Sequence, residues 1–129
     1  MSVGIVLVTH GSTGSDLIES AEFILGQRME SVRVVPFNQS ESHCAGIGEV
    51  REAIESAGDG DGVLVLTDLF GASPCNLVAD QLEHYQAVMV TGLNLAMLMS
   101  VWNYRDQPLG ALARKAVDSG RRSMKIVQK

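Results

Sequence analysis

The sequence predicts an α/β fold: one small, doubly wound domain built on a mostly parallel sheet. Short runs of apolar, β-branched residues alternate along the chain with longer segments whose apolar residues recur at helical spacing. The apolar runs are nearly continuous, which is typical of strands that are buried on both faces of a parallel sheet. A chain of 129 residues has the size of a single domain, so we expect residues 1–129 to fold as one unit.

Three strands and two helices are expected in the N-terminal half. The strands cover residues 3–9, 32–37 and 63–68, and the helices cover residues 15–26 and 42–57. Ser15 and Gly26 are residue types that favour the start and the end of a helix. Pro36 has no amide hydrogen for a neighbouring strand, so the second strand should lie at an edge of the sheet or end there. Gly46 and Gly48 weaken the second helix.

The C-terminal half continues the same alternation. Its expected helices cover residues 73–83, 94–103 and 109–119, and its expected strands cover residues 86–91 and a short final segment, 122–127. Because strands and helices alternate, the strands should be parallel and joined by right-handed crossovers. The common strand order for such a sheet is 2-1-3-4, which places the first and third strands side by side.

Composition and charge narrow the class of function. The net charge is −5, which argues against non-specific binding to nucleic acid, and the low aromatic content of 5% argues against stacking of single-stranded bases. No apolar segment approaches the ~20 residues that a membrane span requires. Cys44 and Cys75 are too few for a disulfide framework or a set of metal ligands. We therefore expect a cytoplasmic protein that uses no cofactor and no metal.

Polar residues follow the first and third strands at the point where each should end. His10 ends the first strand and Asp68 ends the third. Ligands of open parallel sheets bind beyond these carboxyl ends, where the strand order reverses. The carboxylate can hold the proton of one ring nitrogen of His10 and leave the other nitrogen bare and nucleophilic. We interpret Thr9 as a strand-forming residue. The chain contains no GxSxG elbow, which argues against a serine hydrolase.

The segment FGASPCN, which follows the third strand, predicts an anion site. Ser73 is a favoured N-cap and Pro74 a favoured first helical residue, so we expect a helix to start here. The free amide groups and partial positive charge of a helix N-terminus suit a phosphoryl group. The small residues near the two strand ends allow a phosphoryl group to approach the backbone closely: Gly11, Gly71 and Ala72. Combined with the histidine–aspartate pair, this segment indicates transient phosphorylation of the histidine.

The segments IVLVTHGSTGSDLIESAEFILG and VLVLTDLFGASPCNLVAD resemble the IIA domain of the mannose-family (mannose/fructose/sorbose) sugar phosphotransferase system. The similarity extends over essentially the whole chain, and it implies a single phosphocarrier domain at residues 1–129. It implies a phosphotransferase that accepts a phosphoryl group from phospho-HPr on Nε2 of His10 and passes it to a IIB component. By the same resemblance, Asp68 supports the histidine and Ser73 lies near the phosphoryl group.

The resemblance also implies an assembly. Members of this family form homodimers that exchange a C-terminal strand, which residues 122–127 could supply. The link to the membrane is then indirect, through the IIC/IID transporter. Two departures from the family pattern are small: Gly71-Ala72 replaces two glycines, and Phe70 stands where tryptophan is frequent. Both keep the features that favour a helix start.

Two alternatives remain at this point. The same site would serve a regulator without a transport role, whose phosphorylation state sets its binding to another protein. A small tetrapyrrole metal chelatase also begins with a strand that ends in His-Gly-Ser. Chelatases usually need a second histidine at a later strand end, where this chain carries Asp68-Leu69-Phe70. The sugar is not encoded here, because specificity in such systems resides mainly in the membrane and IIB components.

Overall fold

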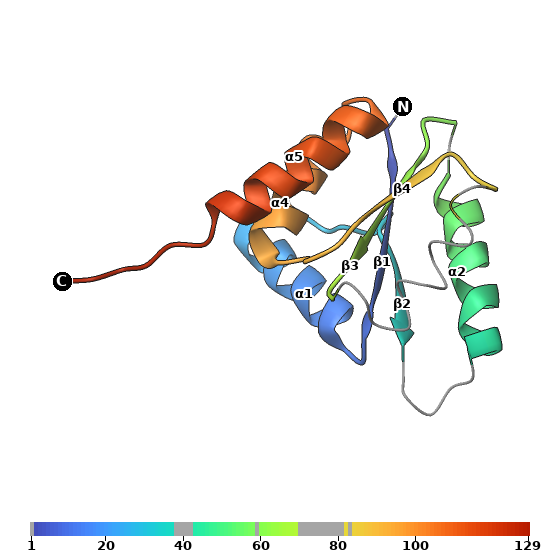
Figure 1. Cartoon of the computed structure of the whole chain (residues 1–129), viewed down its shortest axis with the longest axis horizontal. Helices are drawn as coiled ribbons and strands as arrows, with labels where there is room; N and C mark the ends of the chain where they lie inside the picture. The colour runs from blue at the N-terminus through green and yellow to red at the C-terminus, as the bar shows by residue number, and fades with distance from the viewer. Residues whose placement is uncertain (1, 38–42, 59, 70–81, 83) are drawn as a thin grey trace.

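The computed structural model describes residues 2–37, 43–58, 60–69, 82 and 84–129, with the backbone alone for residues 43–47 (Figure 1). Its strands are β1 (Gly4–His10), β2 (Arg33–Phe37), β3 (Val63–Thr67) and β4 (Ala87–Val90). The helices in this part of the chain are α1 (Thr13–Leu25), α2 (His43–Ala57), α4 (Leu95–Asn103) and α5 (Leu109–Arg122). The expected helix at residues 73–83 falls almost entirely outside the described residues.

The four strands form one parallel sheet in the order β2-β1-β3-β4, which confirms the predicted fold class and strand order. β2, which contains Pro36, lies at an edge of this sheet, as its proline predicts. β1 lies between β2 and β3, with Val8 paired to Thr67 and His10 paired to Phe37. The carboxyl ends of the two central strands therefore lie side by side.

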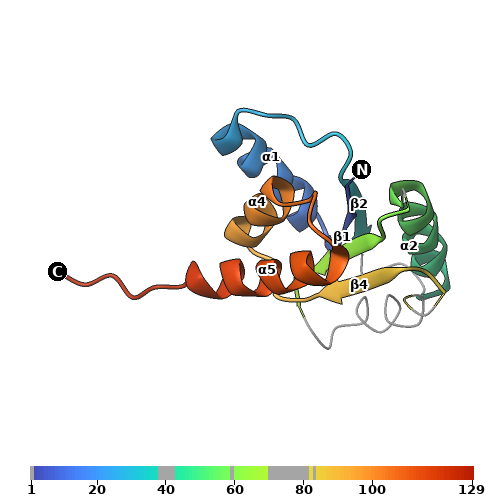
Figure 2. The same ribbon diagram turned by 90° about the horizontal axis from the view of Figure 1, so that it is seen from above.

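Helices cover both faces of the sheet, so the strands are buried on both sides. Figures 1 and 2 show α1, α4 and α5 on one face and α2 on the other. In β1, Ile5 and Leu7 join the core under α1, α4 and α5, whereas Val6 and Val8 join the core under α2. Side chains alternate between the faces of a strand, and both faces here are apolar. This arrangement explains why the strand reads as a continuous apolar run.

The first helix begins earlier than its sequence predicts. The N-cap is Ser12 rather than Ser15, and the hydroxyl of Ser12 donates a hydrogen bond to the carboxylate of Asp16 at 2.9 Å. The predicted end is confirmed, because Gly26 adopts the left-handed conformation with φ 67° and closes the helix. The start lies so close to the end of β1 that the connecting turn contains only Gly11 and Ser12 between strand and helix.

The C-terminal segment differs from its expected form. α5 continues to Arg122, whose guanidinium lies 3.1 Å from the carboxylate of Asp118 one helical turn earlier. Basic residues in the last turn stabilise the helix there, because their positive charge interacts favourably with the partial negative charge at its C-terminus. Residues 124–129 have no regular secondary structure in this chain and extend away from the sheet (Figure 1). The expected strand at residues 122–127 is therefore absent from the fold of one chain.

No helix within the described ranges combines the length and the apolar character needed to cross a membrane.

Candidate functional site

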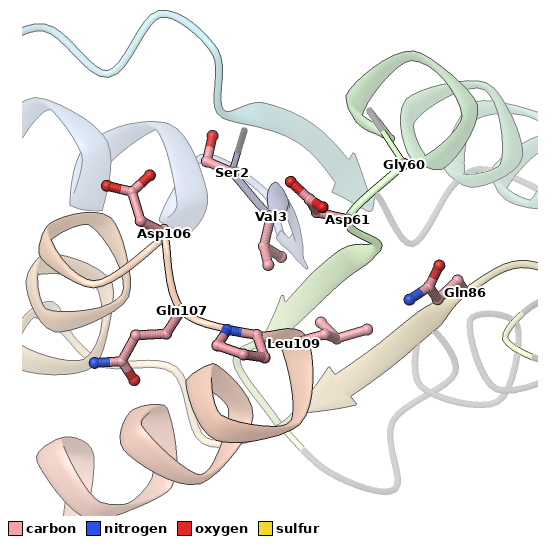
Figure 3. A pocket seen from close by; sticks show the side chains of 9 residues that line it. Ser2, Val3, Gly60, Asp61, Gln86, Asp106, Gln107 and Leu109 are labelled. Atoms are coloured by element: carbon pink, nitrogen blue, oxygen red, sulfur yellow. The ribbon is translucent and has the colours of Figure 1, made fainter.

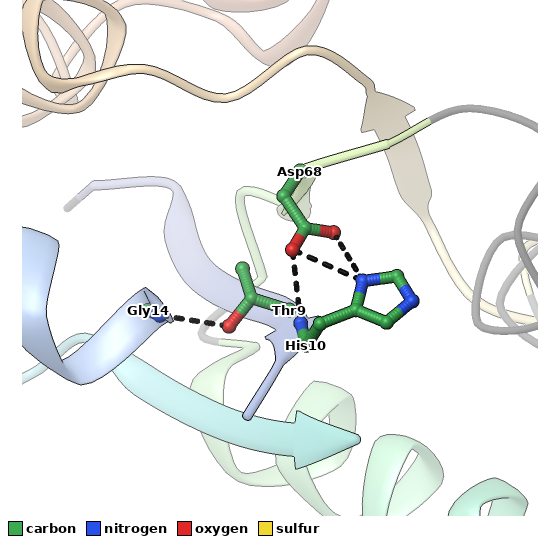
Figure 4. Close-up of polar contacts among 4 residues, drawn as sticks. All are labelled: Thr9, His10, Gly14 and Asp68. Carbon is green, nitrogen blue, oxygen red and sulfur yellow. Dashed lines mark hydrogen bonds and ion pairs between the residues drawn. The ribbon is translucent and has the colours of Figure 1, made fainter. Parts of the chain in front are cut away.

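The imidazole of His10 and the carboxylate of Asp68 meet beyond the ends of β1 and β3 (Figure 4). His10 Nδ1 lies 3.0 Å from Oδ1 and 3.1 Å from Oδ2 of Asp68. The backbone N–H of His10 also donates a hydrogen bond to Oδ2 of Asp68 at 2.9 Å. The structure thus brings together the two residues, 58 positions apart, that the sequence places at neighbouring strand ends.

The surroundings of Asp68 keep its carboxyl group ionised. Partial burial raises the pKa of this carboxyl group, but hydrogen bonds from the backbone and imidazole of His10, together with the charge of the imidazole, lower it further than burial raises it. The net pKa of Asp68 therefore lies below its usual value. An ionised carboxylate only accepts hydrogen bonds, so it favours the tautomer in which Nδ1 of His10 carries the proton.

This tautomer leaves Nε2 of His10 with a free lone pair. In Figure 4 the Nε2 side of the ring points away from Asp68. The side chain of His10 is 40% exposed, whereas that of Asp68 is 18% exposed. The arrangement presents a nucleophilic nitrogen to an incoming group while the carboxylate stays behind the ring. Such a pair can act as a nucleophile, or as a base when another nucleophile is present.

The turn after β1 contains contacts that the sequence interpretation missed. The hydroxyl of Thr9 is fully buried and accepts a hydrogen bond from the backbone N–H of Gly14 at 2.9 Å (Figure 4). Gly11 adopts φ 50°, and its N–H donates to the carbonyl of Phe37 in β2 at 3.1 Å. Thr9 is thus more than a strand-forming residue. A glycine in the first turn of a helix was the signal that a neighbouring group approaches the backbone closely.

Most of the predicted anion site falls on residues 70–81, which the structure does not describe. Gly71, Ala72 and Ser73, together with Pro74 and Cys75, lie outside the described residues. Within the described part of the chain, no three His, Cys, Asp or Glu side chains are arranged to hold a metal ion. The geometry of the site is therefore built from His10 and Asp68.

A separate cavity of about 420 Å³ lies at the opposite ends of the strands (Figure 3). Its lining comes from residues that precede β1, β3 and β4, from the connection between α4 and α5, and from the first residue of α5: Ser2, Val3, Gly60, Asp61, Gln86, Asp106, Gln107, Pro108 and Leu109. Because His10 and Asp68 lie at the carboxyl ends, this cavity is not part of their site.

A family profile and two curated relatives that match this chain all belong to PTS components. Residues 4–117 match the family profile EIIA-man, described as "PTS system fructose IIA component". The mannose-specific EIIAB component of the PTS from Escherichia coli strain K12 is 31% identical over 134 residues, covering 99% of this chain. The chain spans only 40% of the length of that relative. The fructose-specific EIIA component of the PTS from Bacillus subtilis strain 168 is 28% identical over 105 residues. This match covers 81% of this chain and 71% of that component.

Solved structures have the same fold. A mannose/sorbose-specific IIA subunit from Enterococcus faecalis superposes with a TM-score of 0.90 at 23% identity, covering 100% of this chain and 97% of that subunit. A PTS component EIIA from Streptococcus agalactiae superposes with a TM-score of 0.86 at 26% identity, with 96% of each chain covered. The strand ends that carry His10 and Asp68 therefore belong to a fold shared with PTS IIA proteins.

Proposed function

The chain belongs to the EIIA-man family of PTS IIA components, and we propose that it is a phosphocarrier that receives a phosphoryl group from phospho-HPr on Nε2 of His10 and passes it to a IIB component. The observation that carries this proposal is the contact between Asp68 and Nδ1, which leaves Nε2 free. Membership of this family favours the phosphocarrier over the metal chelatase alternative. A cytoplasmic location remains the expectation from the sequence.

The proposed transfer requires no proton to leave His10. The lone pair of Nε2 attacks phosphorus, a phosphorus–nitrogen bond forms, and the bond between phosphorus and HPr breaks with its electron pair leaving on HPr. His10 keeps the proton on Nδ1, so the phosphorylated ring is positively charged. That charge develops 3.0 Å from the Asp68 carboxylate, which stabilises it electrostatically. Transfer to the IIB component reverses these steps.

Phosphoryl transfer depends mainly on positioning and on electrostatic stabilisation of charge. Asp68 supplies the second of these at the ring of His10. We include Ser73, Gly71, Ala72 and Gly11 in the proposal as the groups around the phosphoryl oxygens. Their part rests on the residue types alone, since a helix start and open glycine backbone suit an anion.

We further propose that two copies associate through their C-terminal segments. No strand within the described residues pairs with the outer side of β4, and an unpaired edge is a template for another strand. A groove of about 450 Å³ runs between β4 and α5, with Val88 and Val117 in its lining. The tail that follows α5 exposes Met124, Ile126 and Val127 to solvent and leads away from its own sheet (Figure 1). A tail in that position suits the groove of a second copy.

The proposed phosphorylation is tested by incubating the protein with phosphoenolpyruvate, enzyme I and HPr. We expect the intact mass to increase by one phosphoryl group. The modification should be acid-labile, as a phosphohistidine is, and should be absent from His10→Ala. An unmodified mass for the wild-type protein under conditions in which HPr is phosphorylated would rule out the proposed function.

Two further variants test whether the reaction is specific to His10 and whether it depends on Asp68. His84→Ala removes an exposed histidine outside the site and should be phosphorylated like the wild type. Asp68→Asn removes the charge that stabilises the phosphorylated ring, and we expect transfer to slow by roughly 10²-fold, as when one preorganised electrostatic group is removed from an active site. A wild-type rate for folded Asp68→Asn would exclude Asp68 from the mechanism.

A further inference from the structure

We propose that Thr9 is a positioning residue for His10, acting through the hydrogen bond between its hydroxyl and the backbone of Gly14. The inference rests on the proposed function of His10, because it concerns how the ring is held ready for the phosphoryl group. Three observations support it: the direction of the Thr9 side chain, the space available at Gly14, and the hydrogen bonds along the turn between them.

The direction of Thr9 follows from the pleat of β1. Side chains alternate between the two faces of a strand, so Thr9 points to the same face as Ile5 and Leu7, where α1 packs. Its side chain is fully buried there, in a layer that is otherwise apolar. A hydroxyl in such a place needs a partner, because an unpaired buried polar group is costly. Gly14 provides it, with its N–H 2.9 Å from Oγ1 of Thr9.

The space at Gly14 admits this contact only without a side chain. A Cβ placed on Gly14 would lie 2.6 Å from Oγ1 of Thr9 and 3.1 Å from Cγ1 of Val34. The N–H groups of the first helical turn have no acceptor within the helix, so the bond to Thr9 satisfies one of them. Thr9 and Gly14 thus form a matched pair, in which a hydroxyl at the strand end meets a bare helix start.

The hydrogen bonds along the turn hold the backbone of His10 from three elements. The N–H of His10 binds Asp68 after β3, and the N–H of Gly11 binds the carbonyl of Phe37 in β2. The bond from Gly14 to Thr9 adds the third link, to α1. It closes the loop from Thr9 to Gly14 directly around the residue that carries the imidazole. When this link is lost, the turn gains freedom and the ring of His10 leaves its place against Asp68 more often.

The consequence for chemistry is a rate effect rather than a binding effect. A reacting group displaced by ~1 Å can lose about 10² in rate. Removing the hydroxyl of Thr9 should loosen His10 rather than remove it, so a smaller loss of about tenfold is expected. Because Thr9 is buried, it cannot contact phospho-HPr, and the KM for phospho-HPr should change little.

The central test compares Thr9→Val with Thr9→Ser. Valine keeps the shape of the side chain but cannot accept the hydrogen bond, whereas serine keeps the hydroxyl. We expect Thr9→Val to lower the maximal rate of phosphorylation by phospho-HPr about tenfold and Thr9→Ser to stay within about twofold of the wild type. In unphosphorylated protein, ¹⁵N NMR of the His10 ring should show Nδ1–H in the wild type and in Thr9→Ser, and a mixture of tautomers in Thr9→Val.

Gly14→Ala tests the same link from the other side. It keeps the threonine hydroxyl but displaces it, and we expect the same loss of rate and the same mixed tautomer. In the Thr9→Ala background, addition of Gly14→Ala should slow the reaction less than it does in the wild type, because the oxygen nearest to its Cβ is gone and only the 3.1 Å approach to Val34 remains. Such non-additivity identifies two residues that act through one contact. If Thr9→Val does not fold, this second pair of variants decides the question with the same readouts.

The outcomes distinguish this inference from the proposed function. A wild-type rate and a wild-type ¹⁵N pattern in folded Thr9→Val would overturn the positioning role, as would equal losses in Thr9→Val and Thr9→Ser. A wild-type protein that is not phosphorylated would overturn the proposed function. The comparison of tautomers uses unphosphorylated protein, so it would still decide whether Thr9 positions His10.

Discussion

The Asp68 carboxylate binds two parts of the same residue. It accepts one hydrogen bond from the backbone of His10 and another from its ring. The backbone contact ties the end of β1 to the end of β3, and the ring contact selects the tautomer. A single carboxylate therefore links the local fold to the chemistry of the site, and its ionisation should be visible in the stability of the protein.

We expect the free energy of unfolding to fall at acid pH because of Asp68. The pKa of this carboxyl group is lower in the folded protein than in the unfolded chain, for which about 3.9 is typical. The stabilisation is thus fully present above the unfolded pKa and is lost as pH falls through the lower, folded pKa. Urea titrations between about pH 5 and pH 2 should show a steeper loss in the wild type than in Asp68→Asn. Parallel curves would mean that the contact with His10 does not form in solution.

Two glycines, one in α2 and one just before β3, differ in backbone conformation and in the space around them. Gly48 lies in α2 with open space where a Cβ would be. Gly62 precedes β3 with φ 90°, and a Cβ there would lie 2.8 Å from Leu109 and 3.0 Å from the carbonyl of Gln86. Gly48 weakens α2, because glycine is a poor helix former. Gly62 has a positive φ and close neighbours, and both are unfavourable for a residue with a side chain.

Alanine substitutions at these two glycines should change stability in opposite directions. We expect Gly48→Ala to raise the free energy of unfolding by about 0.5–1 kcal/mol, because alanine is the better helix former. Gly62→Ala should lower it by about 1–3 kcal/mol, because it combines backbone strain with a steric clash. Urea denaturation of both variants at neutral pH measures the two effects. Equal changes of the same sign would contradict this account of the backbone.

The tail beyond α5 concerns the molecule as a whole. If it pairs with the β4 edge of a second copy, the wild type should sediment as a dimer, with twice the chain mass of 13.8 kDa. Removing residues 124–129 should give a monomer, as should the joint substitution of Ile126 and Val127 by aspartate. Analytical ultracentrifugation measures this directly.

Phe23→Asp provides the matched control for the tail. Phe23 is also an exposed apolar side chain, at 88% exposure, but it lies on α1, away from the β4 edge. The substitution Phe23→Asp should therefore leave the dimer unchanged. A wild-type monomer at micromolar concentration, or a truncated protein that stays dimeric, would exclude the proposed exchange of tails.

Much of the architecture follows from local patterns. The continuous apolar run in β1 predicts a strand with two covered faces, and Pro36 predicts the edge position of β2; the structure confirms both. The sequence-based prediction is wrong where a contact with another element sets the boundary of a helix. Ser15 is a good N-cap by type, yet α1 starts at Thr13, because Gly14 already approaches Thr9. The role of Ser73 stays a prediction.

Periodicity and residue type were sufficient to place His10 and Asp68 at adjacent strand ends, because parallel strands in a known order put their carboxyl ends on one edge of the sheet. They were not sufficient to show which ring nitrogen faces the carboxylate, or that Thr9 binds the start of α1. Those contacts depend on register between strands far apart in the chain and on a close approach of strand and helix. Hydrogen bonds act over about 3 Å, so only the folded chain brings these atoms within reach.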